Sequence, residues 1–408
     1  MDSLTPFSVP GCTFVIRKDV ENRLLGADKM MRVQSSISVF CRAFGVVAAI
    51  IAFVTPVCAS TITVHPKFGG QILGYDIDQN GTEGVLSEYV DEPGGTVLAA
   101  TETFDQSTGA IIKVLKKTQN QDDFATQGVF GQSVGLVLFQ HNHINSFLTA
   151  DPLSLNVFNG SWTPPLKPGY QLGGLSSSQG SRTAAAFESS LGADSAYVFA
   201  TNIAQNTSGP LFSLATILHG DEFLISPTLA YDSRTGRAIL ADSQGCPEQG
   251  CTTDVAVVNL STGAIAEFND NLGIGSVEGL AVDPATGIAV TTTLVDSGVE
   301  FYDLAKRSGF EVTIPGLLDE LDSGLDVEFD ALNKVFLVSQ YSSTANPNDP
   351  EPRVYVYDER GNVLETIPIQ RVGTSPSHIA INPRTRTGFL DEVVEPQHEF
   401  LELQSFNY

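Results

Sequence analysis

Residues 277–303 read VEGLAVDPATGIAVTTTLVDSGVEFYD, and this stretch contains the unit that the chain repeats. It predicts a strand, a tight turn, a second strand, a loop and a third strand. Copies of its first part are PTLAYDSRTG from Pro227, EGLAVDPATG from Glu278, LDVEFDALNK from Leu325 and SHIAINPRTR from Ser377. The residues that begin the turns are 51, 47 and 52 positions apart: Asp232, Asp283, Asp330 and Asn382. A period of about 40–50 residues with short strands is typical of a propeller blade of four antiparallel strands.

The length predicts how many blades there are. A fainter copy, LGYDIDQNGT, places Asp78 205 positions before Asp283, or four periods. Residues 60–408 therefore predict an all-β, seven-bladed β-propeller of four-stranded antiparallel blades, which begin near residues 71, 124, 181, 227, 278, 325 and 377. The last blade lacks an outer strand. Residues 61–66, TITVHP, are expected to supply it by pairing with residues 399–406, which would close the ring and remove a free sheet edge.

The first segment, residues 1–59, has a different character. Residues 43–54, AFGVVAAIIAFV, form an apolar run of 12, too short to span a bilayer comfortably. Arg32 and Arg42 precede it, and Val57-Cys58-Ala59 follows. This pattern predicts a signal peptide cleaved after Ala59, and hence a secreted or periplasmic protein. A lipoprotein attached through Cys58 is the alternative, although Val57 stands where a small residue is expected. Translation from Met1, Met30 or Met31 is left open.

The net charge limits the partners, and the cysteines indicate the compartment. The formal net charge of −25 disfavours nucleic acid and anionic membrane as partners. After cleavage two cysteines remain, Cys246 and Cys251, in SQGCPEQGCTTD. Their spacing suits a disulfide that closes a short loop in an oxidising compartment, and two free thiols are the alternative.

Part of the chain resembles a known group of propellers. The stretch TIPIQRVGTSPSHIAINPRTR at residues 366–386, and the DPATG turn with its FYD strand, resemble YVTN-type and NHL-type repeats, most clearly in the last four blades. The resemblance implies an extracytoplasmic propeller and a binding module more often than an enzyme. Lactone-hydrolysing propellers of similar shape hold a divalent metal with Glu, Asp and Asn side chains. That set is not matched residue by residue in this sequence.

The connections indicate which face is functional. Turns such as SRTGR, DPATG and PRTR are short, whereas the other connections are long and irregular, and binding usually lies on such loops. Four residues fall at or next to the start of innermost strands, around the expected mouth of the central channel: Gln127, Glu278, Asp326 and His378. Carboxylates and an imidazole can hold a metal or polarise an ester. The alternative is solvated side chains bonded to the backbone.

Acidic residues collect in the long connections, and basic residues in the short turns. Asp319, Glu320 and Asp322, with Glu278 and Asp326, form a candidate metal set, for which Ca²⁺ is favoured because the ligands are oxygens. A role in solubility is the alternative. The sequence thus predicts a monomeric binding module for a small molecule, glycan or protein, or alternatively a metal-dependent, lactonase-like hydrolase. It does not identify the ligand, and it leaves open whether the protein is an enzyme.

Overall fold

The computed structural model describes the following residues: 7–9, 12–14, 61–79, 81–92, 96–118, 125–131, 136–141, 146–151, 156–162, 164, 166–177, 183–189, 196–202, 205, 207–214, 228–244, 252–274, 277–293, 298–315, 324–340, 353–369, 378–394 and 399–408. The chain divides into two compact units, Met1–Ser60 and Thr61–Tyr408. In the first unit, β1 (Phe7–Val9) pairs with β2 (Cys12–Phe14). No helix in the described part of the chain is long and apolar enough to cross a membrane.

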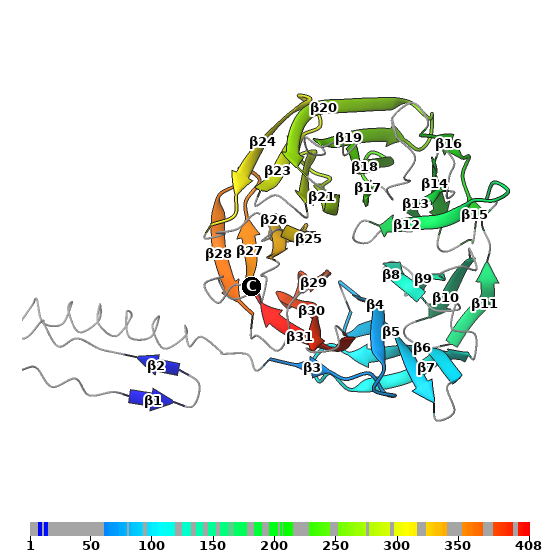
Figure 1. The fold of residues 1–408 in the computed structure, drawn as a ribbon, viewed down its shortest axis with the longest axis vertical. Coiled ribbons are helices and arrows are strands. Elements are labelled where there is room, and N and C mark those ends of the chain that lie inside the picture. Colours follow the sequence, from blue (N-terminus) through cyan, green and yellow to red (C-terminus); the bar gives the residue numbers. More distant parts are fainter. Residues whose placement is uncertain are drawn as a thin grey trace, which may run out of the picture. The chain divides into compact units, whose positions relative to one another are not determined.

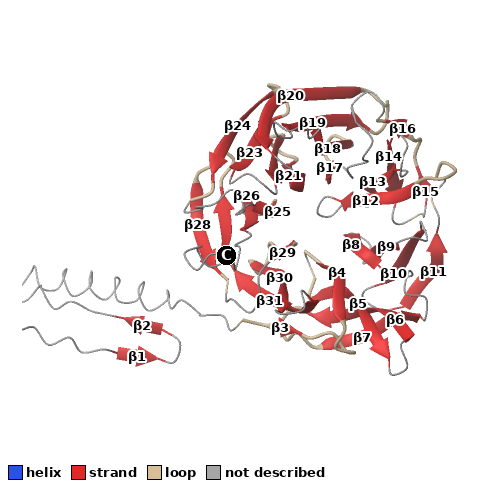
Figure 2. Ribbon diagram, viewed as in Figure 1, coloured by secondary structure: helices blue, strands red, loops and turns tan. Residues whose placement is uncertain are grey.

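The second unit is a ring of antiparallel sheets, each with one strand near the ring axis (Figures 1 and 2). Three four-stranded sheets come from the middle of the chain. They are β17 (Thr228–Asp232), β18 (Arg237–Gln244), β19 (Thr252–Asn259) and β20 (Ile265–Ile274); β21 (Val277–Asp283), β22 (Ile288–Thr293), β23 (Gly298–Asp303) and β24 (Ser308–Thr313); and β25 (Gly324–Asp330), β26 (Val335–Gln340), β27 (Arg353–Tyr357) and β28 (Val363–Pro368).

Three further four-stranded sheets come from the ends of this unit. They are β4 (Gln71–Ile77), β5 (Glu83–Glu92), β6 (Thr96–Asp105) and β7 (Ile111–Thr118); β8 (Ala125–Gly131), β9 (Leu136–His141), β10 (Ser146–Asp151) and β11 (Asn156–Trp162); and β29 (Ile379–Asn382), β30 (Thr387–Val394), β31 (Glu399–Asn407) and β3 (Thr63–Val64). Six sheets are therefore four-stranded antiparallel blades.

The expectation of seven four-stranded blades is wrong. The sheet between the second and fourth blades along the chain has five strands: β12 (Gln171–Ser177), β13 (Thr183–Ser189), β14 (Ala196–Asn202), β15 (Thr207–Ser208) and β16 (Phe212–Ser213). Both β15 and β16 pair with β14, so two short strands occupy the outer position. Gly209 and Pro210 lie between them, and proline has no amide hydrogen to donate to a strand ladder. This sheet also begins at Gln171, not near residue 181 as the sequence analysis expected.

Contact between the two ends of this unit is shorter than the sequence analysis expected. β3 pairs with β31 only through Thr63 opposite Gln404 and Val64 opposite Leu403. The backbone N–H of Ser405 also donates to the carbonyl oxygen of Ile62 at 2.8 Å. A closing strand over the whole of residues 61–66 is therefore not shown.

Apolar side chains fill the spaces between neighbouring sheets. Leu280 and Val282 of β21 pack with Ile239 and Val255 of the preceding sheet. On the other face, Val290 and Phe301 pack with Phe336 of the following sheet. Both faces of a blade are therefore covered, which explains why an inner strand such as IAVTTT is buried at five of its six positions and lacks polar alternation.

A buried polar residue organises four of the short turns that follow innermost strands. The Oδ1 atom of Asp330 accepts the backbone N–H groups of Leu332 and Asn333, both at 2.8 Å. Equivalent contacts to the turn backbone are made by Asp232, Asp283 and Asn382. The residue four places further on has a positive φ in all four turns: Gly236, Gly287, Lys334 and Arg386. The repeat that the sequence analysis recognised thus corresponds to a real turn geometry.

Candidate functional site

The innermost strands begin at one end of the ring, which we call the channel mouth. Five of these strands, β4, β8, β12, β21 and β25, have a register shift near this end. In β21 the shift lies between Val277 and Gly279, so that Glu278 is the extra residue. Bulges re-aim side chains and are frequent next to functional sites. The Glu278 side chain is exposed in this way at the mouth.

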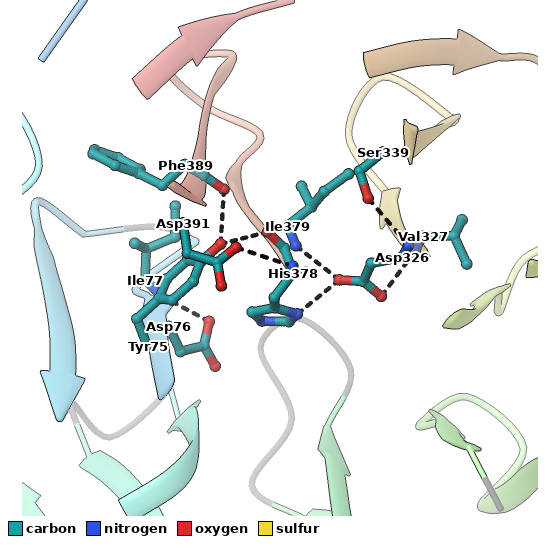
Figure 3. Close-up of polar contacts among 10 residues, drawn as sticks. All are labelled: Tyr75, Asp76, Ile77, Asp326, Val327, Ser339, His378, Ile379, Phe389 and Asp391. Atoms are coloured by element: carbon teal, nitrogen blue, oxygen red, sulfur yellow. Dashed lines mark hydrogen bonds and ion pairs between the residues drawn. The ribbon is translucent and has the colours of Figure 1, made fainter. Parts of the chain in front are cut away.

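Two of the predicted residues form a direct contact there. The Nδ1 atom of His378, which precedes β29, lies 2.7 Å from Oδ2 of Asp326 on β25 (Figure 3). The same Oδ2 accepts the backbone N–H of Ile379 at 2.7 Å, and Oδ1 accepts that of Val327 at 2.8 Å. The carboxylate is 14% exposed and the imidazole 36% exposed. This pair joins two neighbouring blades through one charged contact and one backbone hydrogen bond, that from Ile379, since the bond from Val327 lies within β25.

A tyrosine from a third blade contacts the histidine. The hydroxyl of Tyr75 on β4 donates to the carbonyl oxygen of His378 at 2.5 Å. The carbonyl oxygen of Phe389 lies 3.3 Å from the same hydroxyl. The rings of Tyr75 and His378 meet edge-on, with centroids 5.1 Å apart. The backbone N–H of His378 donates to Oδ1 of Asp391 at 3.2 Å (Figure 3). The backbone and the ring of His378 are therefore both held in place.

Two further carboxyl groups share this electrostatic environment. Burial raises the pKa of Asp76 to about 7, and the positive charge of His378 limits the rise. Burial and then the charge of Asp326 raise the pKa of Glu328 to about 8. Burial alone would favour a neutral imidazole, but the carboxylates of Asp326, Glu328 and Asp76 more than offset it and raise the pKa of His378 to about 10. His378 is therefore a cation at neutral pH.

The cluster also affects the pKa of Glu278 at the mouth. The side chain of Glu278 is exposed, but much of its surroundings is protein. This partial burial, and then the charge of Asp326, raises the pKa of Glu278. The site thus combines one imidazolium with several carboxyl groups. Clusters of perturbed titratable groups are frequent at functional sites, although structural networks produce them as well.

The arrangement does not form a metal centre within the described residues. No group of three or more His, Cys, Asp or Glu side chains there could hold a metal ion. Both oxygens of Asp326 already accept backbone N–H groups, and one of them also meets His378. The charges of Glu278 and Asp326 therefore interact, and the described residues add no third ligand to them.

Other predicted residues have less structural context. Gln127 lies in β8, opposite Gln140, and only its backbone is described. Asp319, Glu320, Asp322, Cys246 and Cys251 lie outside the described residues. The metal set and the disulfide therefore stay predictions.

The sequence analysis missed several members of the cluster, namely Tyr75, Asp76, Glu328 and Asp391. A signal existed for two of them. Asp76 and Glu328 both stand two residues before the turn residue of their copies, Asp78 and Asp330, where the copies at Asp232, Asp283 and Asn382 have alanine. An acidic residue at an otherwise apolar position of an innermost strand marks a charged site near the axis.

The fold and this site define a β-propeller with a charged cluster at the channel mouth. No family model and no curated protein matches the sequence. The resemblance to YVTN-type and NHL-type repeats is thus supported only at the level of the propeller fold. Among solved structures, the chain is similar to a chain in the crystal structure of the mitotic checkpoint complex, with a TM-score of 0.56 and 11% identity over 87% of this chain and 94% of that chain. At this identity the likeness shows the fold alone.

Proposed function

We propose that the protein is a secreted or periplasmic binding module that holds a ligand or partner at the channel mouth, beside Glu278, Asp326 and His378. The observation that carries the proposal is the contact of 2.7 Å between Asp326 and His378, surrounded by the carboxyl groups of Asp76 and Glu328. Rigid strands position these groups, as a binding site requires. Many propellers place their binding surface on the loops at one end of the ring.

The chemistry favours a ligand with positive charge or several hydrogen-bond donors. His378 is engaged by Asp326, whereas the carboxylate of Glu278 is exposed next to this pair. A cationic or donor group placed there would offset the mutual repulsion of Glu278 and Asp326, which contributes to the raised pKa of Glu278. A glycan, a basic peptide segment and a small cationic ligand, including Ca²⁺ bound with the acidic connection at residues 319–322, meet this requirement.

A panel of defined ligands tests the proposal. Wild type and Glu278→Gln are compared on a glycan array, on lysine-rich and arginine-rich peptides and in Ca²⁺ titrations, with Glu365→Gln as the control on the exposed outer strand β28. At least one ligand is expected to bind wild type and the control equally and Glu278→Gln about tenfold more weakly, because a hydrogen bond to a charged group is lost. If every ligand that binds wild type binds Glu278→Gln with the same affinity, the proposed site is wrong.

The alternative function is a metal-dependent hydrolase of lactones. A panel of lactones with and without a chelator distinguishes it from binding alone. If the protein hydrolyses a lactone and the chelator abolishes this activity, the protein is a metal-dependent hydrolase and the binding proposal is wrong. Secretion has its own measurement, the intact mass of exported protein, which is expected to begin at Ser60.

A further inference from the structure

A small cavity lies near the ring axis, at the end opposite the channel mouth. Its lining includes Pro284 and Ala331, which follow the innermost strands β21 and β25 at their turns. The polar side chains of the lining are Gln79, Ser176, Ser177, Tyr231 and Glu328, which come from four different blades. The volume of the cavity is about 80 Å³. The cavity is therefore a built feature of the ring, separate from the exposed side chain of Glu278.

The lining is rich in hydrogen-bond acceptors. Carboxylate, hydroxyl and amide oxygens can all accept, and the described residues that line the cavity include no lysine, arginine or histidine. One basic side chain, Arg234, lies at this rim. Its Nη1 donates to the carbonyl oxygens of Ala285 at 2.7 Å and of Pro284, a lining residue, at 3.4 Å. A positively charged guest would therefore meet mainly acceptors in the described wall, with the Arg234 guanidinium at the rim already bonded to two carbonyl oxygens.

The remaining surroundings also favour a cation. After burial, the charges of Asp326 and Asp76 raise the pKa of Glu328, whereas His378 and the backbone N–H of Phe329 lower it. Phe329 and Tyr231 add aromatic rings to the lining, and aromatic faces attract cations. Apolar contacts come from Leu280 and Val282, which suit an alkyl chain. The lining thus offers acceptors for an ammonium group and apolar contacts for a short hydrocarbon.

The volume restricts the guest. A cavity of about 150 Å³ holds benzene, so about half of that volume suits a group of only a few heavy atoms. A primary ammonium has three N–H donors and can use several acceptors, whereas a bulky quaternary ammonium has none.

We propose that this cavity binds a primary ammonium group, supplied by a free alkylamine or by a lysine side chain, with Glu328 as its anionic partner. The cavity shares Glu328 with the surroundings of the Asp326–His378 pair, but Glu278, the exposed carboxylate that the ligand panel tests, does not line it. Failure of the ammonium proposal and failure of the proposed function are therefore distinguishable.

Nuclear magnetic resonance titration with methylammonium chloride tests the proposal, against sodium chloride at equal ionic strength. At about pH 9 methylammonium is still charged, and Glu328, with a pKa of about 8, is ionised. We expect saturable shifts at the cavity with a dissociation constant on the order of 10 mM, the range open to so small a ligand. Glu328→Gln is expected to weaken binding at least about tenfold, and Glu365→Gln, on the exposed outer strand β28, is expected to bind as wild type does.

Two further probes identify the source of the ammonium group and the largest guest that the cavity accepts. Nα-acetyl-lysine amide that binds more tightly than methylammonium would assign the cavity to a lysine side chain, and the reverse order would assign it to a free amine. Tetraethylammonium is expected not to bind. Equal binding of methylammonium by wild type and Glu328→Gln, equal binding of tetraethylammonium, or no saturable shift would overturn the proposal.

Discussion

Asp326→Ala is expected to lower the free energy of unfolding by about 3 kcal/mol, near the low end of what removing one partner of a buried ion pair costs. The carboxylate accepts three groups, namely His378 Nδ1 and the backbone N–H groups of Ile379 and Val327. Without it, two backbone donors and an imidazolium lose their acceptor. The expected loss in free energy is at the low end of that range because the His378 side chain is 36% exposed and water can solvate part of its charge.

Urea unfolding measures this loss. Asp326→Asn is expected to cost less, since its amide oxygen can still accept one N–H group. Glu365→Ala, on the exposed outer strand β28, is the control and is expected to change stability by no more than about 0.5 kcal/mol. If Asp326→Ala unfolds at the same urea concentration as this control, then the contact between the two blades contributes no stability.

Asp330→Ala is expected to cost a similar amount, about 3 kcal/mol, for a different reason. Asp330 is fully buried, and its carboxylate accepts the N–H groups of Leu332 and Asn333, the side-chain amide of Asn333 at 2.6 Å and the hydroxyl of Tyr408 at 3.0 Å. The last contact joins the last residue of the chain to the preceding blade. Several buried donors would be left unsatisfied together, at about 1–3 kcal/mol each before relaxation.

The chain provides a matched control for this variant. Asp303 makes the same type of turn between outer strands, where its Oδ1 accepts the N–H groups of Ala305 and Lys306, but its surroundings are exposed. Asp303→Ala is expected to cost less than about 1 kcal/mol because water replaces the lost acceptor. Tyr408→Phe isolates the interblade bond and is expected to cost about 1 kcal/mol. Equal losses for Asp330→Ala and Asp303→Ala in denaturant unfolding would show that burial adds nothing to this turn.

The repeat was predictable because its turns carry local chemistry. Asp232 and Asp330 accept backbone N–H groups two and three residues further on, and Asp283 accepts the one two residues further on. The turn is therefore visible in a short stretch of sequence. The five-stranded sheet was not predictable in the same way. Its inner strand, QLGGLSS, has no β-branched residue and two adjacent glycines, which are poor strand formers. Only pairing with β13 makes this segment a strand.

The site was predictable in part for the same reason. Asp326 and His378 occupy equivalent positions in successive copies, and successive blades are neighbours, so their proximity follows from the repeat. The contact from Tyr75 to His378 spans 303 positions and depends on the ring bringing its first and last blades together. Asp76 and Glu328 stand out in the sequence only when the copies are aligned, because the other copies have alanine at this position.

The titration of His378 is the most direct test of the central claim that a charged pair within the ring forms the core of the site. The nearby carboxylates outweigh burial and give this imidazole a pKa of about 10, so nuclear magnetic resonance should show a ring that keeps both protons between about pH 5 and 8. Because the pKa is raised in the folded state, the associated stability is complete below the ordinary value of 6.5 and is lost as the pH rises through about 10. Asp326→Asn should lower this pKa, because it removes the charge that pairs with the imidazolium. A wild-type His378 that titrates at or below 6.5, or at a value that Asp326→Asn leaves unchanged, would contradict the account.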